Sequence, residues 1–562
     1  MILAFFQSFF LLVVPWVCWR LIRRRLFPTV LDNVPGPKAR SWVAGSLNEL
    51  VNANAWEYHQ KIAETYGAVT RVKGTFGADN LYVFDPKALH HILIKDLHIY
   101  GETEAFCAAS KMIFGETLTN THGERHRQRR KTLNPSFSSS QLREMEPIFY
   151  QIAHKVQRLF IKKAQHGPQE VDVQKWMQRL TLEVIGQAGL GYSFDELTEE
   201  SVRHEYALAA HKLATMPSSI VVSETLIPLI TKIGTPRFRR FVVDILPFKR
   251  IRFLRDIVDT LHRTSMGILK SKRQAIREGD SAVKAQVGGG QDIMSVMMRH
   301  NMLASEDERW SEEELVGQIT AFTFGGTDTT SATLTRTLYL LALHKDVQEK
   351  VREEVRKARK ENGGQDIGHD VLVSLPYLDA ICKETLRLHP PISTLIRVYV
   401  EYRILLILLT FVSYRAQQDV VLPVGTPIKG LHGEQIQEVP LPKGTLIIMS
   451  IFNANRNPKI WGPDAQEWIP ERWLSPLPDS VVNGNIPGVY SHLLTFIAGG
   501  RACIGFRFAQ FEMKVILALL LESLEFSVSD KKIFWQMNGI VTPNLHPNII
   551  DPTLPMVIRL AK

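Results

Sequence analysis

The chain is long, basic and apolar enough to bury a large core. It has 562 residues, of which 45% are hydrophobic, and a net charge of +10. A basic chain can bind an anionic membrane surface, an acidic protein or nucleic acid. Its Lys and Arg residues are scattered and form no recognisable nucleic-acid-binding module, so we expect no nucleic-acid partner. The four cysteines fit neither a disulfide framework nor a zinc site, which predicts a reduced, cytosol-facing protein.

The N-terminus carries a targeting pattern. Residues 2–19 are almost wholly apolar, and four arginines follow within residues 20–25. About 18 apolar residues can just cross a bilayer, and arginines after such a span hold the following chain in the cytoplasm. We predict a single-pass signal anchor over residues 1–25 in the endoplasmic reticulum membrane, with a buried soluble helix as the alternative. Residues 26–37 contain Pro-Gly-Pro and predict a stiff hinge.

The body after the hinge has mainly helical periodicity. Short β-type runs at 68–72 and 81–84 alternate with helical segments, and the pattern then stays mostly helical to about residue 390. Residues 270–290 have the composition of a polar surface linker. Past residue 416 the pattern predicts short strands and loops. In the last 40 residues it predicts strands and turns. No internal repeat is visible, so residues 38–562 predict one mainly α domain with a minor β portion.

One predicted helix, residues 320–343, contains adjacent glycines and a cluster of hydroxyl groups. Each mid-helix glycine costs roughly 0.5–1 kcal/mol relative to alanine. A helix that carries Gly325 and Gly326 near its middle either packs closely on another element or opens a groove there. An ordinary kinked core helix is the other interpretation.

A second helix places opposite charges on one face, because Glu384 and Arg387 are three residues apart. The helix should end before Pro390, since the residue before a proline is pushed out of α geometry. An exposed ion pair of little energetic value is the simpler interpretation.

The most informative stretch is Phe496-x-x-Gly499-x-Arg501-x-Cys503-x-Gly505, which precedes an apolar helical run at 508–521. A thiolate needs a positive field and backbone N–H donors, and a tight turn entering a helix N-terminus supplies both. Such a sulfur is a good axial ligand for haem iron. A lone cysteine is more often a buried structural thiol, but here four companions stand at fixed spacing.

This pattern resembles the haem-binding loop of the cytochrome P450 family. The resemblance implies a single mainly α cytochrome P450 fold around a buried haem b, whose iron is bound by the Cys503 thiolate. It implies a membrane-bound, class II, fungal-like monooxygenase that uses O2. The chain has no flavin or Rossmann segment of its own, so electrons from NADPH must come through a separate NADPH-cytochrome P450 reductase, with cytochrome b5 as a further candidate donor.

The resemblance also assigns roles to the glycine-bearing helix. Gly325-Gly326-Thr327-Asp328-Thr329 resembles the family's distal-helix motif, an acid followed by an alcohol. It implies that oxygen occupies the groove and that Asp328 and Thr329 relay protons to it. A hydroxyl both donates and accepts hydrogen bonds, which suits such a relay.

Basic residues are expected to bind the two haem carboxylates. Arg501 comes from the cysteine loop, and Arg397 matches a further propionate-binding arginine. His126 stands where the family commonly has tryptophan, which makes Arg130 the stronger candidate of that pair. The whole run at 122–131 is otherwise a solvated basic face, or a docking site for an acidic electron donor through Arg125, Arg127, Arg129 and Lys131.

In the family, the Glu384 and Arg387 pair is buried and completed by the arginine of a Pro-Glu-Arg segment. Arg472 matches that arginine here. The resemblance therefore assigns these three residues to folding the scaffold of the haem loop and not to catalysis.

Residues 399–415 do not fit the family pattern. Their apolar centre has about nine residues, too few to span a bilayer. Removing all 17 residues would join Arg397-Val398 to Ala416 in family-like register. We interpret the insert as the translation of an unspliced intron of 51 nucleotides, and a lineage-specific membrane loop is the alternative.

The substrate-lining segments that the family suggests are largely apolar and favour a lipophilic substrate of secondary metabolism, such as a terpenoid or a fatty acid. Residues 226–248 mix apolar and basic side chains and suit a membrane surface. Two other functions stay open. One is a haem-thiolate isomerase or dehydratase, which would not need the acid and alcohol. The other is a haem-binding protein that the insert makes inactive.

Overall fold

The computed structural model describes residues 29–215, 227–228, 230–399, 420–549 and 551–562. This part of the chain is mainly helical with several small sheets, as the sequence predicts. The predicted signal anchor and all of the predicted insert except residue 399 lie outside it. Among the helices of the described residues, none is both long enough and apolar enough to cross a bilayer.

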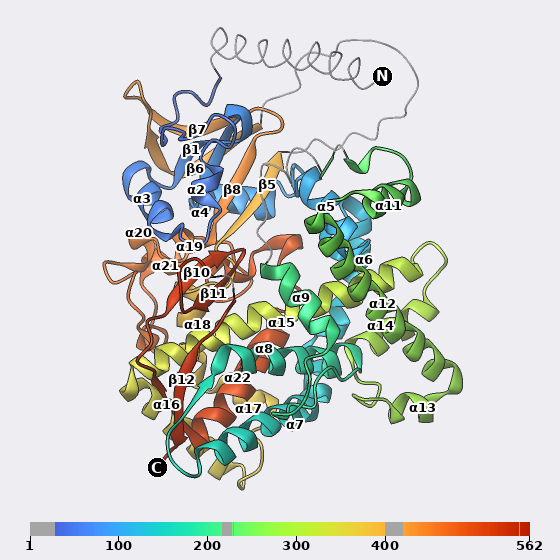
Figure 1. Ribbon diagram of the computed structural model, residues 1–562. Helices are drawn as coiled ribbons and strands as arrows, with labels where there is room; N and C mark the ends of the chain where they lie inside the picture. The colour runs from blue at the N-terminus through green and yellow to red at the C-terminus, as the bar shows by residue number, and fades with distance from the viewer. Residues whose placement is uncertain (1–28, 216–226, 229, 400–419, 550) are drawn as a thin grey trace.

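The largest sheet lies in the upper left of Figure 1 and has the strand order β1-β2-β8-β5-β3. β2 and β8 pair in parallel, and the other neighbours pair antiparallel. The predicted β runs at 68–72 and 81–84 are confirmed as β1 and β2. The strands are β1 (Val69–Lys73), β2 (Asp79–Val83), β3 (Tyr100–Gly101), β5 (Thr394–Tyr399) and β8 (Leu446–Ser450).

Three smaller sheets complete the β structure of the described chain. β6 and β7 form one hairpin, β10 and β11 form another, and β12 lies between β4 and β9. The predicted strand-and-turn character of the C-terminus is confirmed. The strands are β4 (Gln169–Asp172), β6 (Val420–Lys429), β7 (Gln435–Leu441), β9 (Leu524–Val528), β10 (Phe534–Asn538), β11 (Ile540–Asn544) and β12 (Pro555–Leu560).

The helices form a second and larger core, in which α15 crosses the middle of the molecule (Figure 1). Helices α8, α12, α18 and α22 all contact it. The longer helices are α3 (Trp56–Tyr66), α5 (Glu104–Phe114), α6 (Gly123–Leu133), α7 (Ser139–Ala164), α8 (Val173–Val184), α9 (Glu205–Thr215), α11 (Pro236–Ile245), α12 (Lys249–Glu278), α14 (Ile293–Leu303), α15 (Glu312–Leu343), α16 (Lys345–Glu361), α18 (Pro376–Leu388) and α22 (Phe506–Ser523). The shorter ones are α2 (Leu47–Leu50), α4 (Pro86–His90), α13 (Asp280–Ala285), α17 (His369–Ser374), α19 (Ile451–Ala454), α20 (Pro458–Trp461) and α21 (Asp479–Val482).

Helix α15 is longer than the predicted 320–343 because it begins at a capping box. Ser311 and Glu314 satisfy each other's backbone N–H groups there. Threonine is a modest helix former, but in α15 the hydroxyls bond to carbonyls one turn back, as Thr323 does with Ile319 at 2.8 Å and Thr333 with Thr329 at 2.9 Å. These bonds let a helix rich in hydroxyl groups lie in the core.

The expected polar linker at 270–290 is wrong for most of its length. Helix α12 continues to Glu278, and α13 follows directly. The helix persists because Lys272 turns inward and its Nζ lies 2.6 Å from the Asp292 carboxylate, both side chains being almost fully buried. Only the glycines at 288–290, all with positive φ, form the expected turn.

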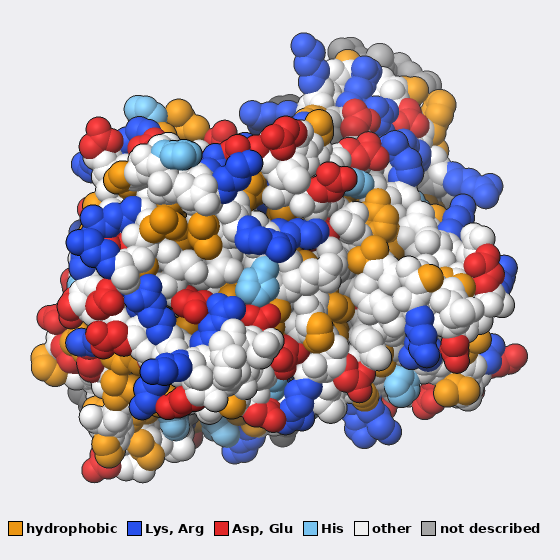
Figure 2. Space-filling model, turned by 90° about the horizontal axis from the view of Figure 1, so that it is seen from below, with side chains coloured by type: hydrophobic (Ala, Val, Ile, Leu, Met, Phe, Trp, Pro, Cys, Tyr) orange, Lys and Arg blue, Asp and Glu red, His pale blue; other side chains and the backbone are white. Residues whose placement is uncertain are grey.

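Figure 2 shows the face at the lower end of Figure 1, near the C-terminus. Basic and acidic side chains alternate over this face, and its apolar side chains form only small groups. Such a surface differs from the region around α11, where large apolar side chains are exposed together.

Candidate active site

The cysteine loop is held by its own backbone and by a tight contact with residue 93. Cys503 N–H donates to the Phe496 carbonyl at 2.9 Å, which closes the loop before α22 begins. Gly499 has φ +64°, and a Cβ there would lie 2.1 Å from the Leu93 carbonyl oxygen. Only glycine therefore fits at position 499. Gly505 is different, because a Cβ there would make only ordinary contact, 3.8 Å from Phe137.

The Cys503 thiol lies deep in the protein and yet is accessible. Burial raises its pKa, while a hydrogen bond from Gly505 N–H and the charge of Arg130 act in the opposite direction. Its side chain is nevertheless exposed, although Ala502 and Phe508 beside it are buried. Both observations hold together only where the sulfur opens onto space inside the protein.

The two glycines of α15 have different surroundings. A Cβ on Gly326 would lie 3.0 Å from the Ile185 side chain, so this glycine permits close packing. Gly325 has no heavy atom within 4 Å of such a Cβ and is exposed in the middle of a buried helix. Close packing therefore accounts for Gly326, and an open groove accounts for Gly325. The Thr329 hydroxyl lies on this open side and donates to the Gly325 carbonyl at 2.7 Å.

Aromatic rings connect the open part of α15 to the cysteine loop. Phe137, which lies beside Gly505, packs edge-to-face on Phe322 with ring centroids 5.6 Å apart. Phe114 of α5 packs on Phe324 at 5.2 Å. The space next to Gly325 therefore has an apolar wall.

Asp328 points away from that space although it is adjacent to Thr329. It is buried against α8, where Gln178 Nε2 donates to its Oδ1 at 3.3 Å. Burial raises the pKa of Asp328 to about 6, and the Gln178 bond opposes this only weakly. The acid and the alcohol thus lie on different sides of one helix turn.

The predicted basic residues surround a carboxylate that the sequence reasoning missed. Glu102 is buried, and its oxygens lie 3.4 Å from Arg397 Nη2 and 3.3 Å from Arg501 Nη2. Its Oε2 is also 3.4 Å from His122 Nδ1, and burial lowers the pKa of His122. With His122 neutral, Arg397 and Arg501 against the one carboxylate of Glu102 leave a net charge of about +1.

His126 and Arg130 are positioned by the helix that carries them. Arg130 donates to the Ala502 carbonyl, next to the cysteine. His126 is buried, and desolvation together with the charges of Arg501 and Arg130 lowers its pKa to about 3. Helix α6 is fixed to the start of α15 because Arg129 binds both oxygens of Glu314 at 3.0 Å.

This pairing corrects the expected basic docking face. Arg129 is buried against Glu314 and the Trp310 ring, and cannot meet a partner at the surface. Arg127 and Lys131 are exposed, and Arg125 is exposed while pairing with Glu116 and Glu314. The basic surface of α6 is therefore smaller than the sequence suggested.

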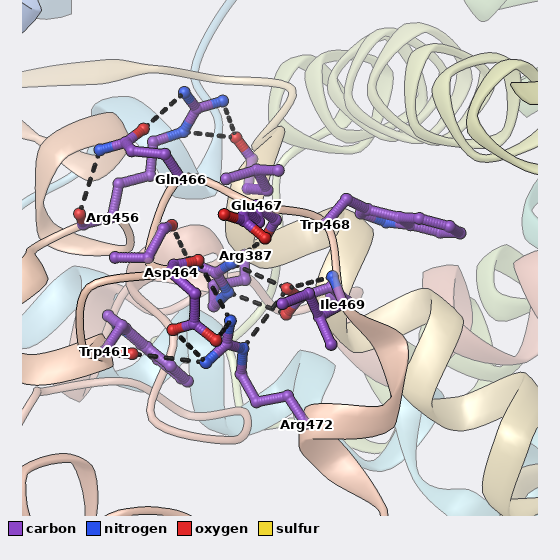
Figure 3. A network of polar contacts seen from close by, with 12 residues as sticks. Arg387, Arg456, Trp461, Asp464, Gln466, Glu467, Trp468, Ile469 and Arg472 are labelled. Carbon is purple, nitrogen blue, oxygen red and sulfur yellow. Dashed lines mark hydrogen bonds and ion pairs between the residues drawn. The ribbon is translucent and has the colours of Figure 1, made fainter. Parts of the chain in front are cut away.

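Glu384, Arg387 and Arg472 meet in a buried network, in which Figure 3 labels the two arginines. Arg387 Nε and Nη2 each donate to Glu384 at 2.8 Å, and both side chains are fully buried. Arg472 Nε lies 3.5 Å from the same carboxylate. Arg387 also donates to three backbone carbonyls, those of Asn455, Ala465 and Glu467.

Glu384 is satisfied as fully as its partners. Besides the arginines, it accepts from Ile469 N–H at 3.0 Å and from Trp473 Nε1 at 2.9 Å. The Glu384 carboxylate and its two arginines thus fix the loop at 455–473 onto α18, which is a structural arrangement.

A cysteine sulfur that is deep but accessible, and a helix with an open central turn whose neighbouring Phe322 packs beside the cysteine loop, are the features expected of a haem-thiolate site. The cytochrome P450 family model matches residues 34–402 and 421–549. The chain belongs to the cytochrome P450 family. It is accordingly a haem-thiolate monooxygenase, an oxidoreductase that incorporates oxygen from O2, and the fungal-like prediction is confirmed.

Curated fungal proteins resemble nearly the whole chain. Cytochrome P450 monooxygenase 91 of Postia placenta is 44% identical over 547 residues, which cover 97% of each chain. A ganoderic acid synthetase of Ganoderma lucidum is 38% identical over 97% of this chain and 96% of its own. A monooxygenase of Hericium erinaceus is 33% identical over similar shares, 97% and 96%.

The sequence patterns did not identify several residues of the site. Glu102 follows a two-residue strand and His122 precedes α6, so neither belongs to a motif. Gln178 comes from α8, about 150 residues before Asp328, and only the packing of α8 on α15 brings them together.

We predict that Arg387→Lys lowers the free energy of unfolding by about 3–5 kcal/mol, because lysine cannot form the two-pronged bond and leaves a buried carboxylate poorly paired. The measurement is urea unfolding followed by circular dichroism. The matched control is Arg143→Lys, whose pair with Asp370 is 50% and 66% exposed and should contribute less than about 1 kcal/mol. Equal losses for the two variants would show that the network does not stabilise the fold.

Proposed function

We propose that the chain hydroxylates or epoxidises a lipophilic small molecule with electrons that a separate reductase transfers from NADPH. The observation that carries this proposal is the Cys503 sulfur, deep in the protein yet open to interior space, in a chain of this family. When bound there, haem b supplies the activation of O2 and the electron transfer.

The residues around that space fit haem. Cys503 Sγ would bind the iron, with Gly505 N–H and the Arg130 charge stabilising the negative sulfur. Arg397 and Arg501 would hold the haem carboxylates. Arg397 and Arg501 outnumber Glu102, and the positive charge that remains favours an anionic group, since neutralising a buried charge avoids the cost of burying it alone.

Thr329 and Asp328 have separate parts in the proposed proton supply. The Thr329 hydroxyl lies at the open turn of α15 and can pass a proton toward the bound substrates of the reaction. Asp328, with a pKa of about 6, exchanges protons readily at cellular pH. An isomerase or dehydratase that does not use O2 would need neither group, so this pair favours the monooxygenase.

The substrate class follows from the apolar wall. Phe114 and Phe324 pack beside the open turn, and large apolar surfaces there favour a lipophilic molecule. One relative is named a ganoderic acid synthetase, which agrees with a substrate of secondary metabolism. For the electron donor, the exposed Arg127 and Lys131 on α6 suit an acidic reductase surface on the sulfur side of the site.

We predict that Cys503→Ser abolishes the red-shifted Soret band of the reduced, carbon-monoxide-bound protein, because a hydroxyl does not replace the thiolate ligand. The control is Cys107→Ser, which removes another thiol near the site and should keep the band. A red-shifted band in Cys503→Ser would exclude Cys503 as the ligand.

The insert is tested with the same spectrum. The family model leaves residues 403–420 unmatched, a gap that overlaps most of 399–415 and that an unspliced intron and a lineage-specific loop would both produce. If the full chain lacks the band and deletion of 399–415 restores it, the insert prevents haem binding. Transcripts that retain all of these codons would contradict the intron interpretation.

The proposed membrane attachment has two parts, the anchor at 1–25 and the surface around α11. Phe238, Phe241 and Ile245 are 49%, 60% and 60% exposed and recur at helical spacing, beside Arg237, Arg239 and Arg240. A basic helix with an exposed apolar stripe binds at a lipid interface. This supports attachment to a membrane surface, and the arginines that follow residues 2–19 favour the cytosolic side of the endoplasmic reticulum membrane.

We predict that a chain lacking residues 1–25 still binds anionic lipid vesicles, and that replacing Phe238, Phe241 and Ile245 with serine weakens this binding at least about tenfold. Vesicle co-sedimentation measures it. Val202→Ser with Leu303→Ser is the control, since these side chains are 90% and 88% exposed elsewhere. Equal losses in both variants would exclude α11 as the lipid-binding surface.

A further inference from the structure

Arg336 of α15 is the exception among the buried arginines of the described chain. It is 9% exposed, its Nε is buried without a hydrogen-bond partner, and it forms no ion pair with a described carboxylate. The other buried arginines each pair with a carboxylate: Arg129 with Glu314, Arg179 with Asp195, Arg352 with Glu349, Arg387 with Glu384 and Arg397 with Glu102. Burying a charge without a partner is costly, so the unpaired charge of Arg336 requires an explanation.

The tryptophan ring beside Arg336 does not replace the missing carboxylate. Arg336 Cζ lies 3.3 Å from the centre of the Trp535 ring, which is a cation–π contact. Arg179 makes the same kind of contact with Trp176 at 4.3 Å and still binds Asp195 through two nitrogens at 2.7 Å. A guanidinium has five N–H donors in its own plane, and a ring stacked on that plane accepts none of them. The N–H groups of Arg336 therefore still need an acceptor.

The groups near Arg336 are also donors or cations. Trp535 Nε1 is buried without a hydrogen-bond partner. His389 Nδ1 accepts from Arg456 Nη2 at 3.3 Å, so the proton of the neutral ring is on Nε2, which can donate. Burial and the charge of Arg336 lower the pKa of His389 well below its usual range, and Arg456 acts in the same direction. Arg336, His389, Arg456 and Trp535, here called the Arg336 cluster, thus combine donors and positive charge without a described carboxylate.

The Arg336 cluster lies where α15 meets α18 and the β10–β11 hairpin, which are neighbours in Figure 1. His389 is the C-cap of α18, and Trp535 belongs to β10. Seven residues are nearly two turns of an α-helix, so Arg336 projects from the same side of α15 as Thr329, about 10 Å further along. Gly325, one turn before Thr329, opens that side of the helix. The unpaired charge is therefore about two helix turns from the hydroxyl at the open turn.

We propose that the Arg336 cluster is an internal binding site for one monovalent anionic group, with the guanidinium of Arg336, Trp535 Nε1 and His389 Nε2 as its donors. Two sources can supply this group, the carboxylate of a lipophilic substrate that extends along α15 and a free halide ion. The first source rests on the proposed function and deepens it, because it makes the substrate a lipophilic acid. The second source is independent of the proposed function.

The charge of the Arg336 cluster favours a single negative charge. Arg456 Nε donates to the Leu388 carbonyl at 2.7 Å, and Arg456 lines a surface groove of about 1300 Å³, where solvent screens its charge. Arg336 has neither a carbonyl partner nor a place in that groove. One positive charge is thus left without compensation. A halide or a carboxylate would balance it, whereas a dianion would leave a buried negative charge in excess.

Binding experiments on the full-length, haem-loaded chain distinguish the two sources. For a carboxylate, dodecanoic and hexadecanoic acids are compared with their methyl esters through the haem spectral shift. The acid should bind at least about tenfold more tightly than its ester, and Arg336→Met should remove this preference while Arg336→Lys keeps part of it. The control is Arg143→Met, which removes a half-exposed charge elsewhere and should keep the preference. For a halide, crystals grown in sodium bromide should show an anomalous bromide peak beside Arg336 that Arg336→Met removes.

Urea unfolding in a halide-free buffer separates an anion site from a structural contact. Arg336→Met should leave the unfolding midpoint unchanged or raise it, because it removes an unpaired buried charge. Arg179→Met is the matched variant on the other stacked arginine, and it should lower the midpoint because it leaves Asp195 unpaired.

Equal losses of stability in Arg336→Met and Arg179→Met would overturn the site. So would the absence of both the bromide peak and an acid preference that depends on Arg336. If the unsubstituted chain lacks the red-shifted Soret band, the proposed function fails, and the bromide peak and the unfolding comparison then decide the anion site alone.

Discussion

The structure depends on one constraint, that a cysteine sulfur be deep in the protein and still open on one side. Burial alone would leave Cys503 a neutral thiol, because desolvation raises its pKa. The Gly505 N–H and Arg130 partly offset that cost. Gly499 lets the loop approach residue 93 closely enough to set the sulfur at this depth. The open turn at Gly325 then preserves the space that the sulfur faces.

Two buried charge clusters support this arrangement and differ in kind. Around Glu384, every charge has a partner, which is how a protein interior tolerates ions. Around Glu102, the arginines outnumber the carboxylate, and the excess positive charge suits an anionic ligand. The Glu384 cluster holds a loop in place. The Glu102 cluster keeps an excess of positive charge that an anionic ligand can neutralise.

Helix α15 separates two environments within one turn. Thr329 lies on the open side, and Asp328 lies buried against α8, where Gln178 donates to it. The acid and the alcohol of this motif therefore have different surroundings although they are adjacent in the chain. Neighbouring side chains of an α-helix point about 100° apart, so the adjacent Asp328 and Thr329 face different sides of α15.

The sequence by itself determined the chemistry: the loop of Cys503, the glycines of α15, and the charges of Glu384 and Arg387 are patterns over a few neighbouring residues, and local spacing expresses their geometry. It also predicted β1, β2 and the end of α18. The interpretation failed at 270–290, where the buried pair of Lys272 with Asp292 keeps a polar segment helical, and at Arg129, whose partner Glu314 is far away in sequence. Only the tertiary structure decided that Glu102 joins Arg397 and Arg501, and that Gln178 bonds to Asp328. The reason is physical: these contacts join segments separated by tens to hundreds of residues, and they form only when the helices pack.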